Sequence, residues 1–188
     1  MQVVHGKSGW LEIICGPMFS GKSEELIKRI RRAQIARRRV QIFKHGIDAR
    51  YDESSIVSHS QQSLPGMAVT HAQDILDQVD DRTELVAIDE GQFFDQDLLP
   101  VVIKLANLGK RVIVAGLDLD YRGVPFGPMP ALLCSAEFVT KQLAICMVCG
   151  DPANFTQRLT PATDQIVVGA AETYEARCRR HFEPPVED

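Results

Sequence analysis

Long apolar runs are missing from this sequence. Residues 85–88 and 112–115 are apolar, but each run stops after four residues, whereas a membrane-spanning helix needs roughly 18. Residues 1–7 are too polar to begin a signal peptide, which has a charged start followed by an apolar segment. We therefore expect a protein that has no membrane span, is not secreted and lies in the cytoplasm.

Cysteine is scarce, and neither sign of charge dominates. The five cysteines are an odd number, and a chain of 188 residues can bury a core without disulfide bonds. We therefore expect reduced thiols that are available for other roles. The net charge is −4 and the pI is about 5.7, whereas nucleic-acid-binding domains usually carry a basic excess. This balance argues against a nucleic-acid partner and says nothing about a small anionic ligand.

What the sequence does contain is an alternation of strand-like and helix-like segments. An apolar stretch rich in β-forming residues at 10–15 leads through a glycine-bearing turn into a helical pattern that starts at 24–27. Within 97–108 the apolar residues at 98, 101, 102, 105 and 108 follow a helical period. Further strands are predicted at 40–43, 85–88 and 111–115. The alternation predicts an α/β fold, with a parallel sheet flanked by helices.

Two segments depart from this alternation. Residues 50–67 are rich in Ser, Gln and Asp and show no periodicity, so we predict a long loop there. After residue 145 the chain changes to short polar segments with paired cysteine-containing motifs at either end. This change indicates a small lobe that is organised by something other than a hydrophobic core. We therefore expect a larger domain at 1–145 and a smaller one at 146–188.

A phosphate-binding loop is predicted between the first strand and the first helix. Residues 16–23 fit the pattern G-x-x-x-x-G-K-[ST], in the strand-to-helix context that this motif requires. Backbone N–H groups and the helix dipole would hold the phosphates, Lys22 would reach the β and γ phosphates, and Ser23 would bind Mg²⁺. An incidental glycine turn is the alternative. The candidate ATP-binding residues are Gly16, Pro17, Met18, Phe19, Ser20, Gly21, Lys22 and Ser23.

An acidic pair ends the apolar run at 85–88. Asp89 is the candidate carboxylate on the side of the Mg²⁺, acting directly or through water. Glu90 has two possible roles: it can take a proton from a substrate hydroxyl, or it can orient a water molecule for hydrolysis. The residues themselves do not choose between these roles, and an acidic pair that merely starts a helix is the alternative.

Two pairs of metal-binding residues lie in the small lobe. Cys146 and Cys149 form one pair, Cys178 and His181 form the other, and 28 residues separate them. This pattern predicts a tetrahedral Cys₃His site for Zn²⁺. Four protein ligands leave no open position, so we assign the metal to stability of the lobe and not to catalysis. A redox Cys-x-x-Cys motif is the competing interpretation.

Two further features concern the surface and the core. Seven Lys and Arg residues lie between 28 and 39. Three interpretations stay open: the solvated face of a helix, a surface that contacts another subunit, or a row of basic side chains that binds nucleic acid. Cys15 and Cys134 have apolar neighbours, and we expect both to be small core residues.

Taken together, the loop at 16–23, the run at 89–94 and the late pairs of zinc ligands resemble the type II thymidine kinases. The similarity extends over nearly the whole chain, and shorter segments at 48–50, 116–118, 125–127 and 156–159 agree with it. His181 stands where vertebrate members have a fourth cysteine. The sequence also ends soon after His181, without the long tail of the vertebrate members, so we expect it to be similar to the bacterial-type members.

The resemblance implies that ATP phosphorylates the 5′-hydroxyl of thymidine, with deoxyuridine as a further possible acceptor. It resolves the role of Glu90 as the general base, and it places Asp48 and Arg50 near the sugar hydroxyls and the developing phosphate charge. It also implies that the loop of the zinc lobe closes over the base as a lasso and binds it by main-chain hydrogen bonds. The implied substrate-binding residues are Met18, Asp48, Phe93, Leu117, Tyr121, Phe126, Thr156, Val167 and Tyr174.

The same resemblance implies a homotetramer that is inhibited by thymidine triphosphate in the same pocket. Two alternatives stay open at this point. One is an ATPase with a phosphate-binding loop and a zinc ribbon that acts on nucleic acid. The other is a metal-stabilised nucleotide sensor without turnover, for which Glu90 would be dispensable.

Overall fold

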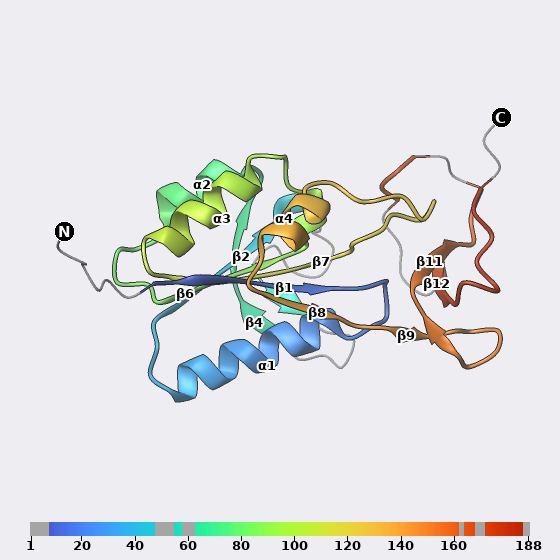
Figure 1. Ribbon diagram of the computed structural model, residues 1–188, viewed down its shortest axis with the longest axis horizontal. Coiled ribbons are helices and arrows are strands. Elements are labelled where there is room, and N and C mark those ends of the chain that lie inside the picture. Colours follow the sequence, from blue (N-terminus) through green and yellow to red (C-terminus); the bar gives the residue numbers. More distant parts are fainter. Residues whose placement is uncertain (1–7, 48–54, 58–62, 162–163, 168–171, 186–188) are drawn as a thin grey trace.

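The computed structural model of the chain describes residues 8–47, 55–57, 63–161, 164–167 and 172–185. A sheet of six parallel strands lies at its centre, in the order β5-β2-β6-β7-β1-β8, with helices on both faces (Figure 1). The predicted α/β fold is therefore confirmed. The strands are β1 (Trp10–Cys15), β2 (Val40–His45), β5 (Met67–Val69), β6 (Leu85–Asp89), β7 (Arg111–Gly116) and β8 (Phe138–Lys141).

Apolar side chains fill the space between the sheet and the helices. Helix α1 (Lys22–Ile35) covers one face, where Ile14 packs with Leu26 and Ile30. The helices on the opposite face are α2 (Ala72–Gln78), α3 (Leu98–Asn107) and α4 (Met129–Ser135). There Ile13 packs with Leu98. Successive side chains of a strand point to opposite faces, so a strand covered on both sides is apolar throughout, as the sequence predicted.

The strand order determines where a ligand can bind. Strands β6, β7 and β1 are neighbours and run parallel, so the loops that follow them emerge at the same edge of the sheet. Those loops contain the predicted phosphate-binding loop and the predicted acidic pair. In parallel sheets, ligands bind at the carboxyl ends of the strands. The small lobe lies beyond this edge, on the right in Figure 1.

The loop predicted at 50–67 is wrong for the strands at 55–57 and 63–65, and its residues 50–54 and 58–62 lie outside the described residues. Residues Ser55–Val57 (β3) and Ser63–Pro65 (β4) pair as antiparallel strands, and β5 begins at Met67 on the edge of the main sheet. Each of these strands is only three residues long. A strand this short contains too few positions to show an alternation of apolar and polar residues, so the pattern gave no sign of it.

The small lobe is built from two pairs of short antiparallel strands. Strand β9 (Ala144–Ile145) pairs with β10 (Pro152–Ala153), and β11 (Phe155–Arg158) pairs with β12 (Tyr174–Arg177). A long connection, residues 159–173, joins β11 to β12. We call it the β11–β12 loop, and the structure describes residues 159–161, 164–167 and 172–173 of it.

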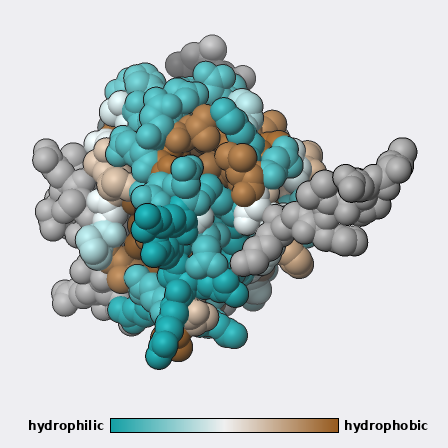
Figure 2. Space-filling model, turned by 90° about the vertical axis from the view of Figure 1, so that its left-hand side faces the viewer, coloured by the Kyte–Doolittle hydropathy of each residue, from teal (hydrophilic) through white to brown (hydrophobic). Residues whose placement is uncertain are grey.

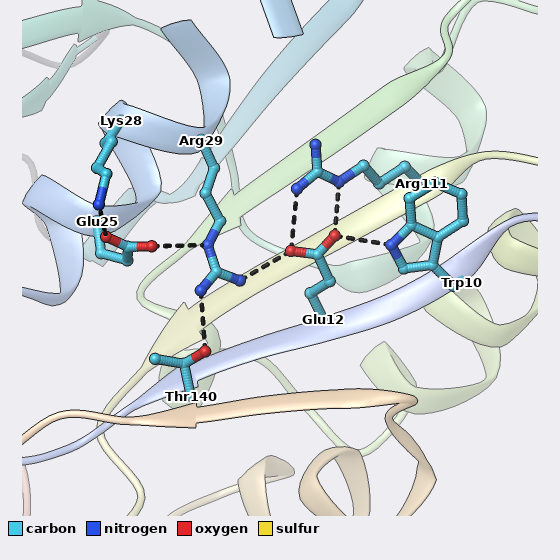
Figure 3. Close-up of polar contacts among 7 residues, drawn as sticks. All are labelled: Trp10, Glu12, Glu25, Lys28, Arg29, Arg111 and Thr140. Carbon is cyan, nitrogen blue, oxygen red and sulfur yellow. Dashed lines mark hydrogen bonds and ion pairs between the residues drawn. The ribbon is translucent and has the colours of Figure 1, made fainter. Parts of the chain in front are cut away.

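A buried carboxylate ties helix α1 to the sheet (Figure 3). Glu12 of β1 pairs with Arg29 of α1 at 2.8 Å and with Arg111 of β7 at 2.6 Å, and it accepts a hydrogen bond from Trp10 Nε1 at 2.7 Å. Arg29 also donates to Thr140 Oγ1 of β8 at 2.9 Å. Helix α1 follows the predicted phosphate-binding loop directly, so this network fixes the helix in place on the sheet.

Candidate functional site

The phosphate-binding loop predicted from the sequence connects β1 to α1. Gly16 has a φ of 140°, and a Cβ on it would lie 2.1 Å from the backbone oxygen of Gln142, so only glycine fits there. Gly21 precedes the helix with a φ of 82°. Lys22 Nζ and Ser20 Oγ both donate to the backbone oxygen of Pro17, at 2.6 and 2.8 Å. The loop is thus folded compactly around the lysine.

The acidic pair lies at the carboxyl end of β6, as predicted. Asp89 is the last residue of the strand, and its Oδ1 accepts a hydrogen bond from the backbone N–H of Glu90 at 3.0 Å. Burial, followed by the negative charge of Glu90, raises the pKa of Asp89 to about 7. Burial lowers the pKa of Lys22, although both carboxylates oppose this effect. A buried acid and a half-buried acid beside one lysine form a site that is suited to a divalent cation.

Glu90 has a left-handed backbone with φ 55° and ψ 41°. Such a conformation is uncommon for a residue other than glycine, and strained residues of this kind cluster at functional sites. It allows the chain to turn sharply from β6 into the short 3₁₀ helix Gly91–Phe93 (η2). The carboxylate of Glu90 lines the same cavity as Lys22 and Ser23.

Gln92 holds the carboxylate of Glu90, a contact that no sequence pattern predicted. Its Nε2 donates to Glu90 Oε2 at 2.5 Å, while its Oε1 accepts from the backbone N–H of Leu117 at 2.9 Å. The residue is only 2% exposed. A Cβ on Gly116 would lie 2.7 Å from Gln92 Oε1, and one on Gly127 would lie 2.3 Å from its backbone oxygen. Two glycines therefore make room for this glutamine.

One cavity of about 430 Å³ joins the phosphate loop, the acidic pair and an apolar pocket. Eight residues expected at the substrate pocket line it, together with Phe19, Gly21, Lys22, Ser23, Asp89 and Glu90. The eight are Met18, Phe93, Leu117, Tyr121, Phe126, Thr156, Val167 and Tyr174. Sequence reasoning did not predict Ile47, Gln92, Leu119, Asp120, Gln165 and Ile166, which also line it. Asp48 and Arg50 lie outside the described residues.

The small lobe supplies one wall of this cavity. Tyr174 donates its hydroxyl proton to the backbone oxygen of Val167 at 2.8 Å, which holds the β11–β12 loop against β12. The backbone N–H of Met18, in the phosphate-binding loop, donates to Thr156 Oγ1 at 3.0 Å. Residues that are far apart in the sequence therefore meet at one site, and a flat apolar ligand fits such walls.

The four predicted metal ligands form a single cluster. The ligand atoms of Cys146, Cys149, Cys178 and His181 all lie within 4.8 Å of one another. The Sγ atoms of Cys149 and Cys178 are 3.8 Å apart, and His181 Nδ1 is 3.3 Å from Cys178 Sγ and 3.7 Å from Cys146 Sγ. A tetrahedral site with Zn–S bonds of about 2.3 Å places its sulfur atoms about 3.8 Å apart. The cluster thus has the donor types and the dimensions of a structural zinc site.

The core of the lobe is too small to organise it alone. The buried cluster around the proposed metal ligands contains only small residues, Ala144, Cys146, Ala153, Ala176 and Cys178, although Phe155 and Tyr174 are also buried in the lobe. Phe19 of the phosphate-binding loop packs against this group. Burial raises the pKa of Cys146, but hydrogen bonds from backbone N–H groups, above all that of Cys178, lower it to about 6. Cys149 differs, because a backbone hydrogen bond from Asp151 lowers its pKa but burial and the neighbouring thiols raise it to about 11. Of these two cysteines, Cys146 is therefore the one that favours the thiolate, the form that binds zinc.

The two cysteines expected in the core differ. Cys15 is buried, as expected, whereas Cys134 is exposed, so that expectation was wrong. Helix α4 buries Met129 and Leu132, which are three residues apart and therefore share one face. Cys134 lies off that face. All five cysteines are free thiols.

The basic run at 28–39 is not entirely a solvated face. The Arg29 side chain is only 17% exposed, because it pairs with Glu12 under the helix, whereas Lys28 is 64% exposed. A stripe for nucleic acid would therefore lack Arg29. This arrangement weakens the alternative of a nucleic-acid-dependent ATPase.

A second hollow lies at the amino ends of the strands, on the side shown in Figure 2, where hydrophilic side chains surround a small hydrophobic patch. Three of its five basic residues, Arg38, Lys110 and Arg111, already have partners. Lys110 Nζ donates to the backbone oxygens of Asp80 and Thr83 at 3.1 and 2.9 Å, and Arg38 pairs with Glu84. The cavity at the carboxyl ends of the strands is therefore the better candidate for a phosphate-bearing ligand.

Comparison with known proteins agrees with this geometry. The family model described as thymidine kinase matches residues 9–182. This chain belongs to the thymidine kinase family. A relative named thymidine kinase, from Rhodothermus sp. (strain ITI 518), is 57% identical over 182 residues, which cover 96% of this chain and 85% of the relative. The resemblance inferred from the motifs is thus confirmed, and membership of the thymidine kinase family makes this chain a kinase.

Membership of the thymidine kinase family supports a reaction that phosphorylates thymidine. It also implies ATP as a ligand, and the Cys₃His cluster is compatible with a structural zinc. None of the helices in the described part of the chain combines the length and apolar character that a bilayer crossing requires.

Proposed function

We propose that this thymidine kinase transfers the γ-phosphate of ATP to the 5′-hydroxyl of thymidine, giving thymidine monophosphate and ADP. One observation carries the proposal: a single cavity contains Lys22 of the phosphate-binding loop, the carboxylate of Glu90 and an apolar pocket. The phosphate donor and the nucleoside would therefore meet beside a carboxylate. Such an arrangement suits transfer between two bound ligands, since an enclosed site excludes water from the γ-phosphate.

Each residue of the site has a definite part in this reaction. Lys22 would pair with the β and γ phosphates, and Glu90 would accept the proton of the 5′-hydroxyl as the oxygen attacks phosphorus. Gln92 holds Glu90 through the 2.5 Å hydrogen bond. In the family pattern, Asp48 and Arg50 would bind the sugar hydroxyls and the developing charge. The proposed phosphate-binding residues are Gly16, Pro17, Met18, Phe19, Ser20, Gly21, Lys22 and Ser23.

Mg²⁺ fits the oxygen donors of this site. Ser23 and Asp89 both line the cavity, and a hydroxyl and a carboxylate are the ligands that Mg²⁺ prefers. Burial beside Glu90 already raises the pKa of Asp89, so a bound cation would relieve the repulsion between the two acids. The ion would neutralise charge on the phosphates. Ser23 and Asp89 are the residues that we propose to hold it.

The nucleoside pocket would be closed by the small lobe. We propose Met18, Phe93, Leu117, Tyr121, Phe126, Thr156, Val167 and Tyr174 as the residues around the base. Phe93 and Phe126 meet edge to face, with ring centroids 5.9 Å apart, which gives the pocket one firm aromatic corner. Zinc on Cys146, Cys149, Cys178 and His181 would keep both ends of the β11–β12 loop in place.

Several finer features follow from the same proposal. The division into a phosphate-binding domain at 1–145 and a zinc domain at 146–188 remains part of it. We infer that deoxyuridine, which lacks only the methyl group, is also an acceptor, and that thymidine triphosphate inhibits from the same pocket. We further propose a cytoplasmic homotetramer that supplies thymidine monophosphate for DNA synthesis by salvage, without a nucleic-acid or membrane partner.

The test measures ADP release from Mg²⁺·ATP with and without thymidine, and it identifies the nucleoside product. We expect ADP only with thymidine, in equal amount with its monophosphate. Glu90→Gln should lower the rate by about 10² to 10⁴-fold, because it removes the general base. Glu183→Gln is the matched control, since this glutamate is exposed outside the cavity. ADP without a nucleoside product would mean that water is the acceptor, and the ATPase alternative would replace our proposal.

A further inference from the structure

Arg158 is a buried arginine that lies beside the cavity and not among the residues that line it. It is the last residue of β11. Its Nη1 donates to the backbone oxygen of Asp164 at 2.6 Å, and its Nη2 donates to that of Gln165 at 3.0 Å. Its Nη2 also lies 3.0 Å from the Tyr174 hydroxyl. One guanidinium therefore contacts the β11–β12 loop at two successive carbonyls and contacts β12 as well.

The same guanidinium reaches the other lobe. Its central carbon lies 3.4 Å from the centre of the Tyr121 ring, in the loop that follows β7. Arginine combines a flat stacking surface with a fork of donors, which lysine cannot reproduce. Arg158 thus connects a wall of the cavity that comes from the sheet with a wall that comes from the zinc lobe.

Because Arg158 binds main-chain oxygens, it also orients the peptide groups of the β11–β12 loop. In a planar trans peptide the C=O and the N–H point in opposite directions. Because the oxygens of Asp164 and Gln165 face the guanidinium, the N–H groups of Gln165 and Ile166 point away from it. Residues 165–167 line the cavity. Arg158 therefore fixes the orientation of the peptide planes in the part of the loop that faces the ligand.

A second contact holds the same segment from the opposite side. Gln165 Nε2 donates to Asp120 Oδ2 at 3.1 Å, and that oxygen also pairs with Arg122 at 2.7 Å. Asp120 is only 2% exposed. The cavity-lining residues of the β11–β12 loop are thus held between Arg158 and the loop after β7.

We propose that Arg158 is a positioning residue for the nucleoside: it holds residues 164–167 of the β11–β12 loop over the base pocket by their main chain and does not touch the substrate. The inference rests on the proposed function, because it assumes that the ligand beneath this part of the cavity wall is a nucleoside. It predicts that the side chain of Asp164 matters less than its main-chain oxygen, which makes the contact with Arg158.

The test compares Arg158→Met with Arg179→Met. Methionine keeps the apolar stem of arginine and removes its hydrogen-bond donors. Arg179 is the control: it is an exposed arginine of the same lobe, and its central guanidinium carbon lies 5.2 Å from the centre of the Phe155 ring. For Arg158→Met we expect the KM for thymidine to rise about 10- to 100-fold, as for the loss of charge-assisted hydrogen bonds. The KM for ATP and the zinc content should stay within about twofold of the wild-type values, and Arg179→Met should change none of the three.

Arg158→Lys provides a second variant. It keeps the positive charge, but a single ammonium cannot stack on Tyr121 and serve both carbonyls, so we expect it to recover only part of the thymidine affinity. Full recovery would contradict the need for a planar fork. Parallel increases in both KM values, together with loss of zinc, would also overturn the proposal, because they would indicate a merely structural role.

Amide hydrogen exchange separates this inference from the proposed function. In Arg158→Met, residues 164–167 should exchange faster than in the wild type, while strands β1, β6 and β7 should be unchanged. Equal exchange of the loop in the two proteins would overturn the inference, whatever the substrate is. Conversely, a wild-type protein that does not phosphorylate thymidine would refute the proposed function alone.

Discussion

Replacing Gln92 by methionine isolates the contact that holds the proposed general base. Methionine has a similar length but cannot donate to Glu90 or accept from the N–H of Leu117, so both hydrogen bonds are lost. A hydrogen bond to a charged group contributes about 1.5–3 kcal/mol. If that energy is realised as correct placement of the Glu90 carboxylate, kcat should fall about 10- to 100-fold, since 1.4 kcal/mol corresponds to a factor of ten.

The same substitution carries a separate cost in stability. The N–H of Leu117 would be left without its acceptor, which costs about 1–3 kcal/mol when the group is buried. Urea unfolding measures this term, and single-turnover phosphorylation at saturating substrates measures the chemical step. The two losses can therefore be separated, because a folded but displaced carboxylate slows chemistry without lowering the fraction of folded protein.

Gln73→Met is the matched control for this experiment. Gln73 Nε2 also donates to a carboxylate, that of Asp77 at 2.8 Å, but on the exposed face of α2. We expect its loss to change the free energy of unfolding by less than about 0.5 kcal/mol and kcat not at all. A kcat within twofold of the wild type in folded Gln92→Met would refute the reasoning that Gln92 positions Glu90.

Two further predictions concern the metal and the buried ion-pair network. Zinc can be removed with a chelator or by the substitution Cys149→Ser, and either change should weaken thymidine binding more than ATP binding in calorimetric titrations. Equal loss of both affinities would indicate unfolding of the whole protein. Burial alone would raise the pKa of Glu12, but hydrogen bonds from Arg111, Trp10 and Arg29 lower it below its usual 4.5. Glu12 therefore contributes stability above its unfolded pKa, and that contribution is lost as the pH falls through the lower folded pKa. Glu12→Gln should cost about 1–3 kcal/mol at neutral pH in urea unfolding and less in acid; a cost that does not change with pH would contradict this assignment.

The parts of the site that were predicted from sequence are those with local chemistry. A phosphate loop needs its glycines and its lysine at fixed spacing, an acidic residue marks the end of a buried strand, and zinc ligands come in close pairs. The structure brings the phosphate loop and the acidic pair together at one edge because β6, β7 and β1 are neighbours. The pocket residues came from the family resemblance, since apolar side chains spread over the chain have no spacing of their own.

The parts that were missed depend on contacts between distant segments. Gln92 acquires its role only because Glu90 adopts a left-handed backbone and Leu117 follows the neighbouring strand. Arg158 acts through main-chain oxygens, and no residue type marks those in a sequence. Arg29 looked like part of a solvated face until its partner, Glu12, was found on the sheet beneath the helix.

The contacts of the phosphate-binding loop with the zinc lobe limit how modular this enzyme can be. Phe19 packs into the core of the lobe, and the N–H of Met18 is bound by Thr156. A fragment cut at residue 145 would keep every residue of the phosphate motif but lose two of the contacts that shape it. Splitting or recombining the chain at that boundary would therefore impair the binding of ATP as well as the binding of thymidine. Grafts that exchange one lobe between relatives need Phe19 and Thr156 to come from the same parent.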